Sequence, residues 1–419
     1  MTARRTLPAL PLLLAAFCAL SLPVVLLGMA GQGGLAFDAV TFHLPQINHF
    51  VHHPGDVLNY PATATTLPFY HAFMGLVARG LGLDAVGNDM VIMRLAHWAI
   101  SGLGLVVLAQ HLLRHCGPAN ALLLGLPFMT SWYVVAGAIY FGTDGPALSV
   151  LLIAMLAAGC SGWAGQACAM VLMVATRHLL LPFLAAIYGI TALAKRSVPA
   201  VLMCGLAAVP AAGLLSIYVA HWGGLTPPGM VASLNPKGVF PYTLIGHLSV
   251  VAIWGVGFGA LRVAEWMDLL QRRKVRLAIL AAVLMVAGIW AGWPTDPSVE
   301  GGRHGSIAWQ LARFGLVGHH APLLLLMACG GAASLVLLGF DLARQGQVPT
   351  HIIALAGFLC TLMLTYAGYQ RYCEPAILAA LTLTTAALTG TAPIARWQQL
   401  PLIALILAST ANTIAHLVK

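Results

Sequence analysis

Charged residues are scarce in this sequence of 419 amino acids: only 7% are Asp, Glu, Lys or Arg, whereas 60% are hydrophobic. A soluble domain carries about 25% charged residues, so this chain has too few of them to cover a water-exposed surface. Apolar segments of about 20 residues form helices in lipid, because a helix satisfies its own backbone hydrogen bonds there. The expected fold class is therefore all-α, a polytopic bundle of transmembrane helices.

Metal-site and disulfide patterns are also missing. None of the eight cysteines forms a C-x-x-C pair, and most of them lie inside apolar runs, so we interpret them as small core residues. His49, His52 and His53 cluster in the sequence, but no H-E-x-x-H pattern accompanies them. We therefore expect neither a metal site nor a cofactor.

Long apolar runs recur along the chain and predict about 13 membrane spans. They cover residues 7–29, 91–113, 119–138, 146–160, 164–176, 179–194, 198–220, 242–262, 276–293, 321–340, 350–368, 375–391 and 399–417. The runs at 164–176 and 179–194 are short, so we expect these segments to be tilted, to be partly re-entrant, or to have span boundaries at other residues. Residues 67–83 are placed as a helix on the membrane surface. Residues 1–30 resemble a signal peptide, but the many later spans favour an uncleaved first span.

The basic residues are distributed unevenly. If the N-terminus is cytoplasmic and the spans alternate, the inner segments hold twelve basic and three acidic residues, and the outer segments hold eight of each. The inner charges are Arg4, Arg5, Arg114, Lys195, Arg196, Arg262, Arg272, Arg273, Lys274, Arg276, Arg344 and Arg396, with Glu265, Asp268 and Asp341. The positive-inside rule thus explains the net charge of +9 and argues against a nucleic-acid partner. This assignment depends on placing residues 67–83 at the membrane surface, because counting them as a span would break the charge pattern.

No internal repeat or soluble linker divides the chain, so we expect residues 1–419 to form a single membrane domain. Its longest non-spanning segments, 30–90, 221–241 and 294–320, all face outward in this topology. The middles of the spans are almost free of charge, whereas a transporter usually places ionisable groups near the bilayer midplane. We therefore expect the function at the outer face.

Two outer carboxylates are candidates for chemistry. Asp38 lies a few residues beyond the first span, where it either caps a helix starting near Ala39 or serves as a general base beside a lipid-borne substrate. Asp144 precedes Gly145 and Pro146, which is ordinary for the start of a helix but also places an acid at the same face.

Several outer cations are candidates for binding a phosphate. Arg177 and His178 lie between two short apolar runs, where Arg177 can either bond helix carbonyls or grip a phosphate with its guanidinium fork. Arg303 lies among glycines that allow backbone amides to approach an anion. Lys237 is a further outer cation, and Arg371 either joins these residues or pairs with Glu374.

The first 180 residues resemble a family. Phe42-His43-Leu44-Pro45-Gln46, shortly after Asp38, resembles the Phe-His-Ile-Pro-Gln run of the dolichyl-phosphate-glucose-dependent alpha-1,2-glucosyltransferases, which belong to the GT-C superfamily. The stretch 65–70 is similar to their Thr-Thr-Pro-Pro stretch, 140–144 to their Tyr-Tyr-Thr-Asp, and 177–179 to their Arg-Gln-Thr. This chain has alanine at 39 and leucine at 67, where the family has a second acid and a proline.

The resemblance implies a GT-C-like fold with interfacial helices in the first outer loop. Residues 1–196 would form the GT-C-like module, with the catalytic loop at 30–90, and 197–419 the variable helices. It implies inverting transfer of a hexose, glucose in that family, from a polyprenyl phosphate to a glycan or lipid-linked acceptor. The implied base is Asp38, with Asp144 in support. The expected donor-phosphate ligands are Arg177, His178, Arg303, Arg371 and Lys237, and the acceptor or structural residues are His43 and Gln46.

Two other classes of function stay open: a transporter or flippase of lipid-linked sugars, and a non-catalytic subunit of a membrane complex. Short loops and the lack of a retention signal at Leu417-Val418-Lys419 favour a bacterial inner membrane, with the active face in the periplasm.

Overall fold

The chain is helical almost throughout. The computed structural model describes residues 9–27, 34–62, 64, 66–227, 238–293, 310, 316–365 and 370–418, and within these ranges the only β contact is an isolated bridge between Val317 and His320. Counted by length and composition, nine described segments are long and apolar enough to cross a membrane, or ten if the bent pair α6 and α7 is one span. The chain is therefore an all-α, multi-pass integral membrane protein, and the number of 13 spans remains a prediction.

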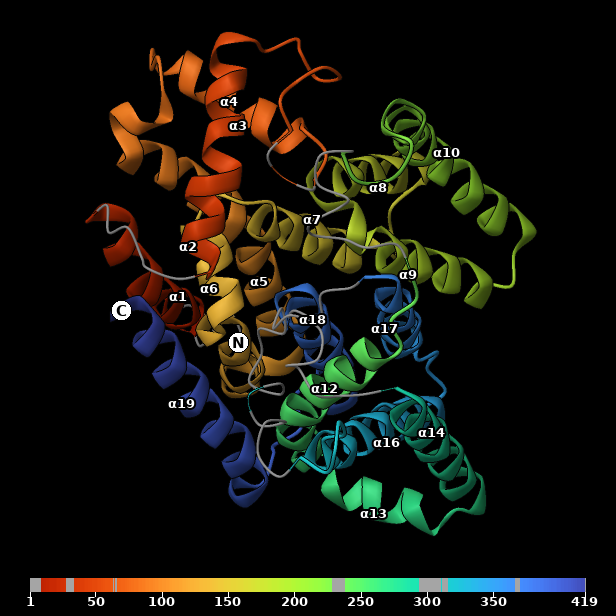
Figure 1. Ribbon diagram of the computed structural model, residues 1–419. Helices are drawn as coiled ribbons and strands as arrows, with labels where there is room; N and C mark the ends of the chain where they lie inside the picture. The colour runs from red at the N-terminus through yellow and green to blue at the C-terminus, as the bar shows by residue number, and fades with distance from the viewer. Residues whose placement is uncertain are drawn as a thin grey trace. The chain divides into compact units, whose positions relative to one another are not determined.

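The helices pack into two compact units (Figure 1). The first unit comprises residues 1–114, 125–234 and 408–419, and the second comprises 115–124 and 235–407. The helices that begin in the first unit are α1 (Ala9–Leu26), α2 (Gly34–Asp38), α3 (Leu44–His52), α4 (Phe69–Gly80), α5 (Met90–Thr130), α6 (Trp132–Ile139), α7 (Asp144–Ala157), α8 (Trp163–Arg177), α9 (Leu181–Ala194) and α10 (Val198–Trp222). Those that begin in the second unit are α12 (Tyr242–Ala260), α13 (Val263–Gln271), α14 (Arg273–Gly292), α16 (Pro322–Arg344), α17 (Thr350–Thr361), α18 (Gln370–Thr389) and α19 (Arg396–Val418).

The long helix α5 reverses direction at Gly117. This glycine has φ +71°, a left-handed conformation that costs glycine little. A methyl group at Gly125 would lie 3.4 Å from Cδ1 of Leu112, although a straight helix would separate these residues by about 20 Å. The run predicted at 91–113 therefore lies on the first arm of α5, whereas the run predicted at 119–138 begins on the second arm and continues past Ser131 into α6.

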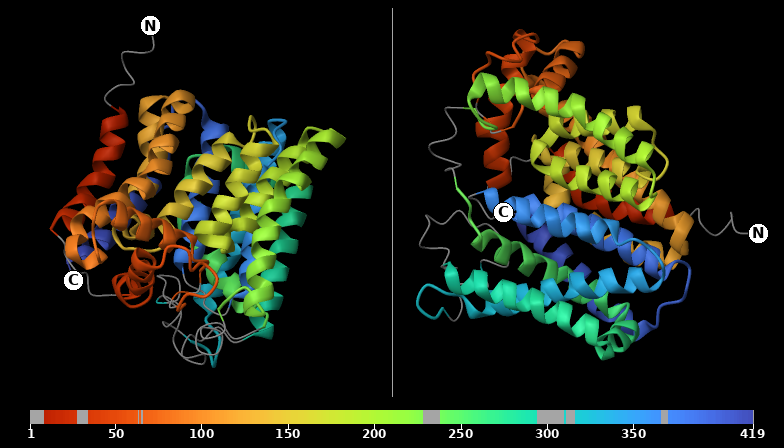
Figure 2. Two further views of the ribbon diagram at one scale, coloured as in Figure 1. Left: turned by 90° about the horizontal axis from the view of Figure 1, so that it is seen from above. Right: turned by 90° about the vertical axis from the view of Figure 1, so that its right-hand side faces the viewer.

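The short helices α8 and α9 also run in opposite directions. Arg177 at the end of α8 pairs with Asp144 at the start of α7, whereas Lys195 after α9 donates a hydrogen bond to the Gly159 carbonyl beyond the end of α7 at 3.4 Å. Because α8 begins at Trp163, near Gly159, the chain must turn back at Arg177. Figure 2 shows α7 to α10 lying alongside one another in its right-hand view. The predicted division between 176 and 179 coincides with this break.

The segment 67–83, placed at the membrane surface by the charge pattern, contains the 12-residue helix α4. A helix of this length rises about 18 Å, which is too short for the hydrocarbon core. Together with α2, α3 and the one-turn 3₁₀ helix Val86–Asp89, it forms a set of short helices in the predicted first outer loop. The placement of these short helices at the membrane interface remains a prediction.

Predicted inner segments of the second unit lie close together. The Arg262 guanidinium reaches the Leu388 carbonyl at 3.5 Å, and Asn120 donates hydrogen bonds to the carbonyls of Gly390 and Ala392 at 3.1 and 2.9 Å. The sidedness of these segments and the orientation of the chain in the membrane remain predictions.

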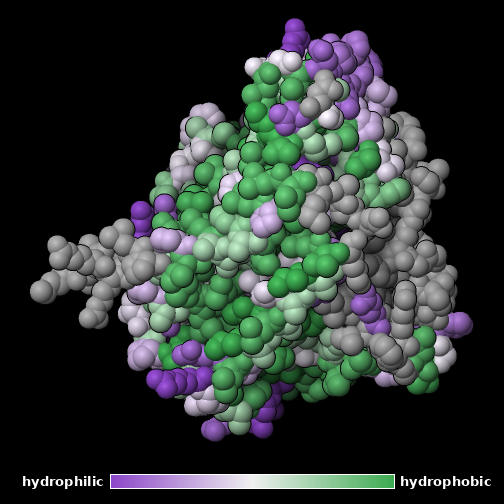
Figure 3. Space-filling model, turned by 90° about the vertical axis from the view of Figure 1, so that its left-hand side faces the viewer, coloured by the Kyte–Doolittle hydropathy of each residue, from purple (hydrophilic) through white to green (hydrophobic). Residues whose placement is uncertain are grey.

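The helices differ greatly in burial. Residues of α12 and α18 are mostly buried, whereas α10, α14 and α19 expose most of their apolar side chains. Figure 3 shows hydrophobic side chains over much of one face, with hydrophilic ones gathered toward its top and bottom. Such large apolar surfaces are stable in lipid and would promote aggregation in water.

Candidate functional site

A sharp bend between α6 and α7 creates the centre of the candidate site. The two helix axes meet at 114° across residues 140–143. At Gly145 a methyl group would collide with the Gly137 carbonyl and with Oγ of Ser101, so this close approach requires glycine. The bend places Asp144 in the first turn of α7, where the helix dipole stabilises a negative charge.

The two predicted ionic groups of this region contact each other. Asp144 and Arg177 form an ion pair, and the Arg177 guanidinium also donates a hydrogen bond to Oγ1 of Thr143 at 3.2 Å. Both charged side chains are largely buried, with 18% and 12% of their surfaces exposed. The charge of Arg177 is thus balanced within the protein, and any phosphate bound there must share this guanidinium with Asp144.

His178 begins the one-turn 3₁₀ helix His178–Leu180 at the reversal between α8 and α9. Its Nδ1 atom is buried and has no hydrogen-bond partner in the described ranges. The backbone break at Arg177 therefore also fixes the position of the second predicted phosphate ligand.

Asp38 lies on continuous helix and does not cap a helix. It is the last residue of α2, with helical φ and ψ of −58° and −42°, and its side chain makes no capping hydrogen bond. The helix-cap interpretation from the sequence is therefore not supported. A π-helical turn, Ala39–His43, follows directly, and such turns occur often at functional sites.

His43 and Gln46 belong to one hydrogen-bonded chain through the fully buried His71. The Ala64 amide donates to Oε1 of Gln46 at 3.2 Å, and Nε2 of Gln46 lies 3.1 Å from Nδ1 of His71. Nε2 of His71 lies 2.8 Å from Nδ1 of His43. The side-chain amide nitrogen of Gln46 can only donate, so with Nδ1 of His71 as its acceptor, neutral His71 donates from Nε2 to His43.

This chain of hydrogen bonds assigns the protonation of His43. If Nδ1 of neutral His43 accepts, its proton is on Nε2, and that atom points to Gly142, where a methyl group would lie 3.6 Å away. Burial and the neighbouring His43 hold the pKa of His71 well below its ordinary value, so His71 stays neutral at pH 7. In this tautomer His43 presents a donor, not a base, to the bend between α6 and α7.

A second chain of hydrogen bonds joins α4 and α5 to the same bend. The Gly142 amide donates to Oη of Tyr70 at 3.3 Å, and this hydroxyl lies 2.9 Å from Nδ1 of His97. Nε2 of His97 donates to the Gly137 carbonyl at 2.9 Å. Tyr70 is buried, which raises the pKa of its hydroxyl, so the phenol remains a donor. His71, Tyr70 and His97 could not be found from the sequence, because no spacing rule connects them to residue 142.

A small cavity lies beside the segment that contains Asp38. Its walls are Ala36, Ala39, Val40 and Leu44 from the first outer segment, Met90 and Arg94 from the first two turns of α5, and Tyr140 and Phe141 from the bend. The cavity volume is about 20 Å³, which is room for one water molecule. Arg94 is 6% exposed and was also missed, although an arginine inside an apolar span is a functional signal in itself.

The remaining predicted site residues lie in the second unit or outside the residues that the structure describes. Lys237 and Arg303 fall outside the described residues. Arg371 lies in the second unit, in the first turn of α18, with its guanidinium carbon 5.3 Å from the centre of the Tyr372 ring. Glu374, which the sequence placed at the outer rim, is 3% exposed and accepts a hydrogen bond from Gln370.

The histidine cluster of the first outer segment has another role. Nε2 of His49 lies 3.2 Å from a carboxylate oxygen of Asp56. Within the described ranges, no three His, Cys, Asp or Glu side chains have the geometry of a metal site. The described residues therefore supply acids, cations and neutral hydrogen-bond donors as the chemical groups of the site.

Comparison with models of protein families, with curated proteins and with solved structures gave no match.

Proposed function

We propose that this membrane protein is an inverting glycosyltransferase of the GT-C type. It moves a hexose, with glucose as the first candidate, from a polyprenyl-phosphate donor to a glycan or lipid-linked acceptor at the non-cytoplasmic face, in a bacterial inner membrane. The observation that carries the proposal is the cavity whose wall contains Ala36 and Ala39, on either side of Asp38 in the chain, together with Arg94 and Tyr140. A buried arginine of α5 thus lies against the segment of the first outer loop that contains Asp38.

The reaction needs a base and a cation in this arrangement. Asp38 takes the proton of the acceptor hydroxyl while the acceptor oxygen bonds to the anomeric carbon of the sugar. The bond from that carbon to the phosphate oxygen breaks, and the leaving polyprenyl phosphate gains negative charge. Arg94, whose fork matches phosphate geometry, stabilises that charge.

The surrounding contacts assign supporting roles. The Asp144–Arg177 pair holds the bend between α6 and α7, and Arg177 and His178 face the donor phosphate from that side. His43 donates from Nε2 to a hydroxyl of the sugar or acceptor, and Gln46 fixes His43 through His71. For Lys237, Arg303 and Arg371, a role in phosphate binding stays a prediction from the sequence.

The test is transfer of labelled glucose from a polyprenyl phosphate in vesicles that contain the full-length protein and a membrane lipid extract as acceptor. Asp38→Asn is expected to lower transfer by at least about 100-fold, the usual contribution of a general base. Asp84→Asn is the matched control, because this exposed carboxylate lies at the other end of the same outer segment. Retained transfer in the Asp38 variant at equal protein level would eliminate Asp38 as the base.

One observation favours a transporter or flippase instead. The helix pair α6 and α7 is broken at a polar bend, and discontinuous helices of this kind form substrate sites in transporters. The same vesicles separate the two functions: a transporter moves the labelled donor across the bilayer without forming a new glycosidic bond. If the wild type shows neither activity, and Asp38 and Arg177 can both be replaced with only local effects on stability, the protein is a non-catalytic subunit.

A further inference from the structure

The short helix α13 of the second unit has two distinct faces. Leu269 is buried in a cluster with Val275 of α14 and Leu337 of α16, and Trp266 packs against this cluster. At Gly259 a methyl group would collide with the Trp266 ring, so glycine allows α13 to fold back against the end of α12. Met267 and Leu270 point outward with 60% and 38% of their surfaces exposed.

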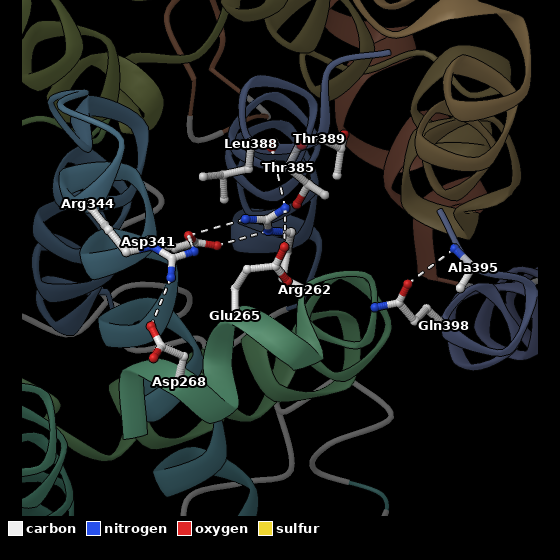
Figure 4. Close-up of polar contacts among 10 residues, drawn as sticks. All are labelled: Arg262, Glu265, Asp268, Asp341, Arg344, Thr385, Leu388, Thr389, Ala395 and Gln398. Carbon is white, nitrogen blue, oxygen red and sulfur yellow. Dashed lines mark hydrogen bonds and ion pairs between the residues drawn. The ribbon is translucent and has the colours of Figure 1, made fainter. Parts of the chain in front are cut away.

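An ionic cluster fixes this helix to α16 (Figure 4). Arg262 grips both carboxylate oxygens of the buried Asp341, at 2.9 and 3.3 Å, and Glu265 at 3.0 Å. The other ion pairs of the cluster are Arg344–Asp341 at 3.2 Å, Arg344–Asp268 at 3.0 Å and Arg272–Asp268 at 3.2 Å. Three arginines thus face three carboxylates, and the cluster is balanced in charge.

Three neighbouring cations are left outside this balance. Arg273, Lys274 and Arg276 are exposed in the first turn of α14, and no ion pair or side-chain hydrogen bond joins them to any residue of the described ranges. The N-terminal end of a helix is the least favourable place for positive charge, because the helix dipole is positive there. The described contacts of the chain therefore give no reason for three cations at this turn.

We propose that α13 and the first turn of α14 form a binding surface for the headgroups of anionic phospholipids. Met267 and Leu270 enter the boundary of the acyl chains, and Arg273, Lys274 and Arg276 contact lipid phosphates. The three cations are expected at the depth of the lipid headgroups, because α14 continues directly from them as an apolar helix of which only a small share is buried. The positive charge of this turn also complements anionic headgroups, because the positive-inside assignment puts the turn at the cytoplasmic leaflet, whose anionic lipids attract basic segments. The surface lies in the second unit and does not depend on the proposed glycosyltransferase activity.

The test compares lipid binding of the full-length protein in detergent by native mass spectrometry and thermal unfolding. Phosphatidylglycerol is expected to bind and to raise the unfolding temperature of the wild type, whereas phosphatidylcholine has a much smaller effect. Replacing Arg273, Lys274 and Arg276 singly by Gln is expected to weaken phosphatidylglycerol binding about fivefold for each cation. Arg79→Gln is the matched control, because Arg79 is an exposed cation at the end of another short surface helix, α4.

The salt dependence of lipid binding by the wild type provides a second test, which needs no variant. The preference of the wild type for phosphatidylglycerol is expected to fall between 50 mM and 500 mM salt, because exposed charges are screened. Equal effects of the two lipids on the wild type, binding that the Gln variants leave unchanged, or an equal effect of inorganic phosphate would each overturn the proposal. The last result would indicate a simple anion site in place of a lipid surface.

Discussion

Asp144 and Arg177 pair across the start of α7 and the end of α8, although 33 positions separate them in the chain. The pair joins the bend after α6 to the reversal before α9, the two backbone breaks in this part of the first unit. A largely buried ion pair is costly to break on one side, because the remaining charge loses its partner and stays desolvated.

This pair predicts strong coupling between the two residues. Asp144→Asn and Arg177→Gln are each expected to lower the free energy of unfolding by about 3 kcal/mol. The double variant should lose clearly less than the sum of the two, because neither charge is then left alone. A double-mutant cycle in detergent measures the coupling energy, and additive losses would show that the pair contributes nothing to stability.

The close packing around Gly145 predicts that a larger side chain does not fit at the same bend. Gly145→Ala forces a methyl group onto the Gly137 carbonyl and Oγ of Ser101, so it should destabilise the protein by at least about 2 kcal/mol. The matched control is Gly189→Ala in α9, where no atom lies within 4 Å of the added methyl group. That control should stabilise the protein by about 0.5–1 kcal/mol, because alanine favours the helix more than glycine. Thermal unfolding of both variants distinguishes packing from helix propensity, and equal effects would contradict the close approach.

His71 predicts a loss of stability in acid. Its pKa is held well below the ordinary value by burial and by His43, so the unfolded chain binds a proton below about pH 6.5 while the native protein does not. Stability is therefore complete above pH 6.5 and falls as the pH drops below it, by about 1.4 kcal/mol per pH unit for this residue. The free energy of unfolding measured from pH 7.5 to 5.5 should fall less steeply in His71→Gln than in the wild type. Parallel slopes would show that His71 is not buried in its neutral form.

Arg94 predicts a defect in donor binding. If its guanidinium holds the donor phosphate, Arg94→Gln should raise KM for the polyprenyl-phosphate donor by about 10-fold or more, the range expected for a hydrogen bond to a charged group. Arg94→Lys keeps the charge but loses the two-pronged geometry, so its KM should lie between those of Arg94→Gln and the wild type. Arg79→Gln is again the control. An unchanged KM in Arg94→Gln would remove Arg94 from the phosphate site.

The class of the protein and much of its helix pattern follow from local sequence alone. Apolar runs longer than the hydrocarbon core predict spans, and the breaks at Gly117 and Arg177 fall between runs that the sequence already separates. The positions of the basic residues also indicate which segments lie together, because lysine and arginine are favoured at one membrane face. These properties depend on composition and period over a single segment.

The contacts of the candidate site depend on the packing of distant segments. Asp144 meets Arg177, His71 links Gln46 to His43, and the cavity brings Arg94 to the neighbours of Asp38. No local sequence period relates residues that are 25 to 60 positions apart. An arginine in a predicted span also looks the same in the sequence whether its side chain faces lipid, another helix or a cavity. Only the three-dimensional packing decides this, because hydrogen bonds and ion pairs form where helices bring side chains within about 3 Å of each other.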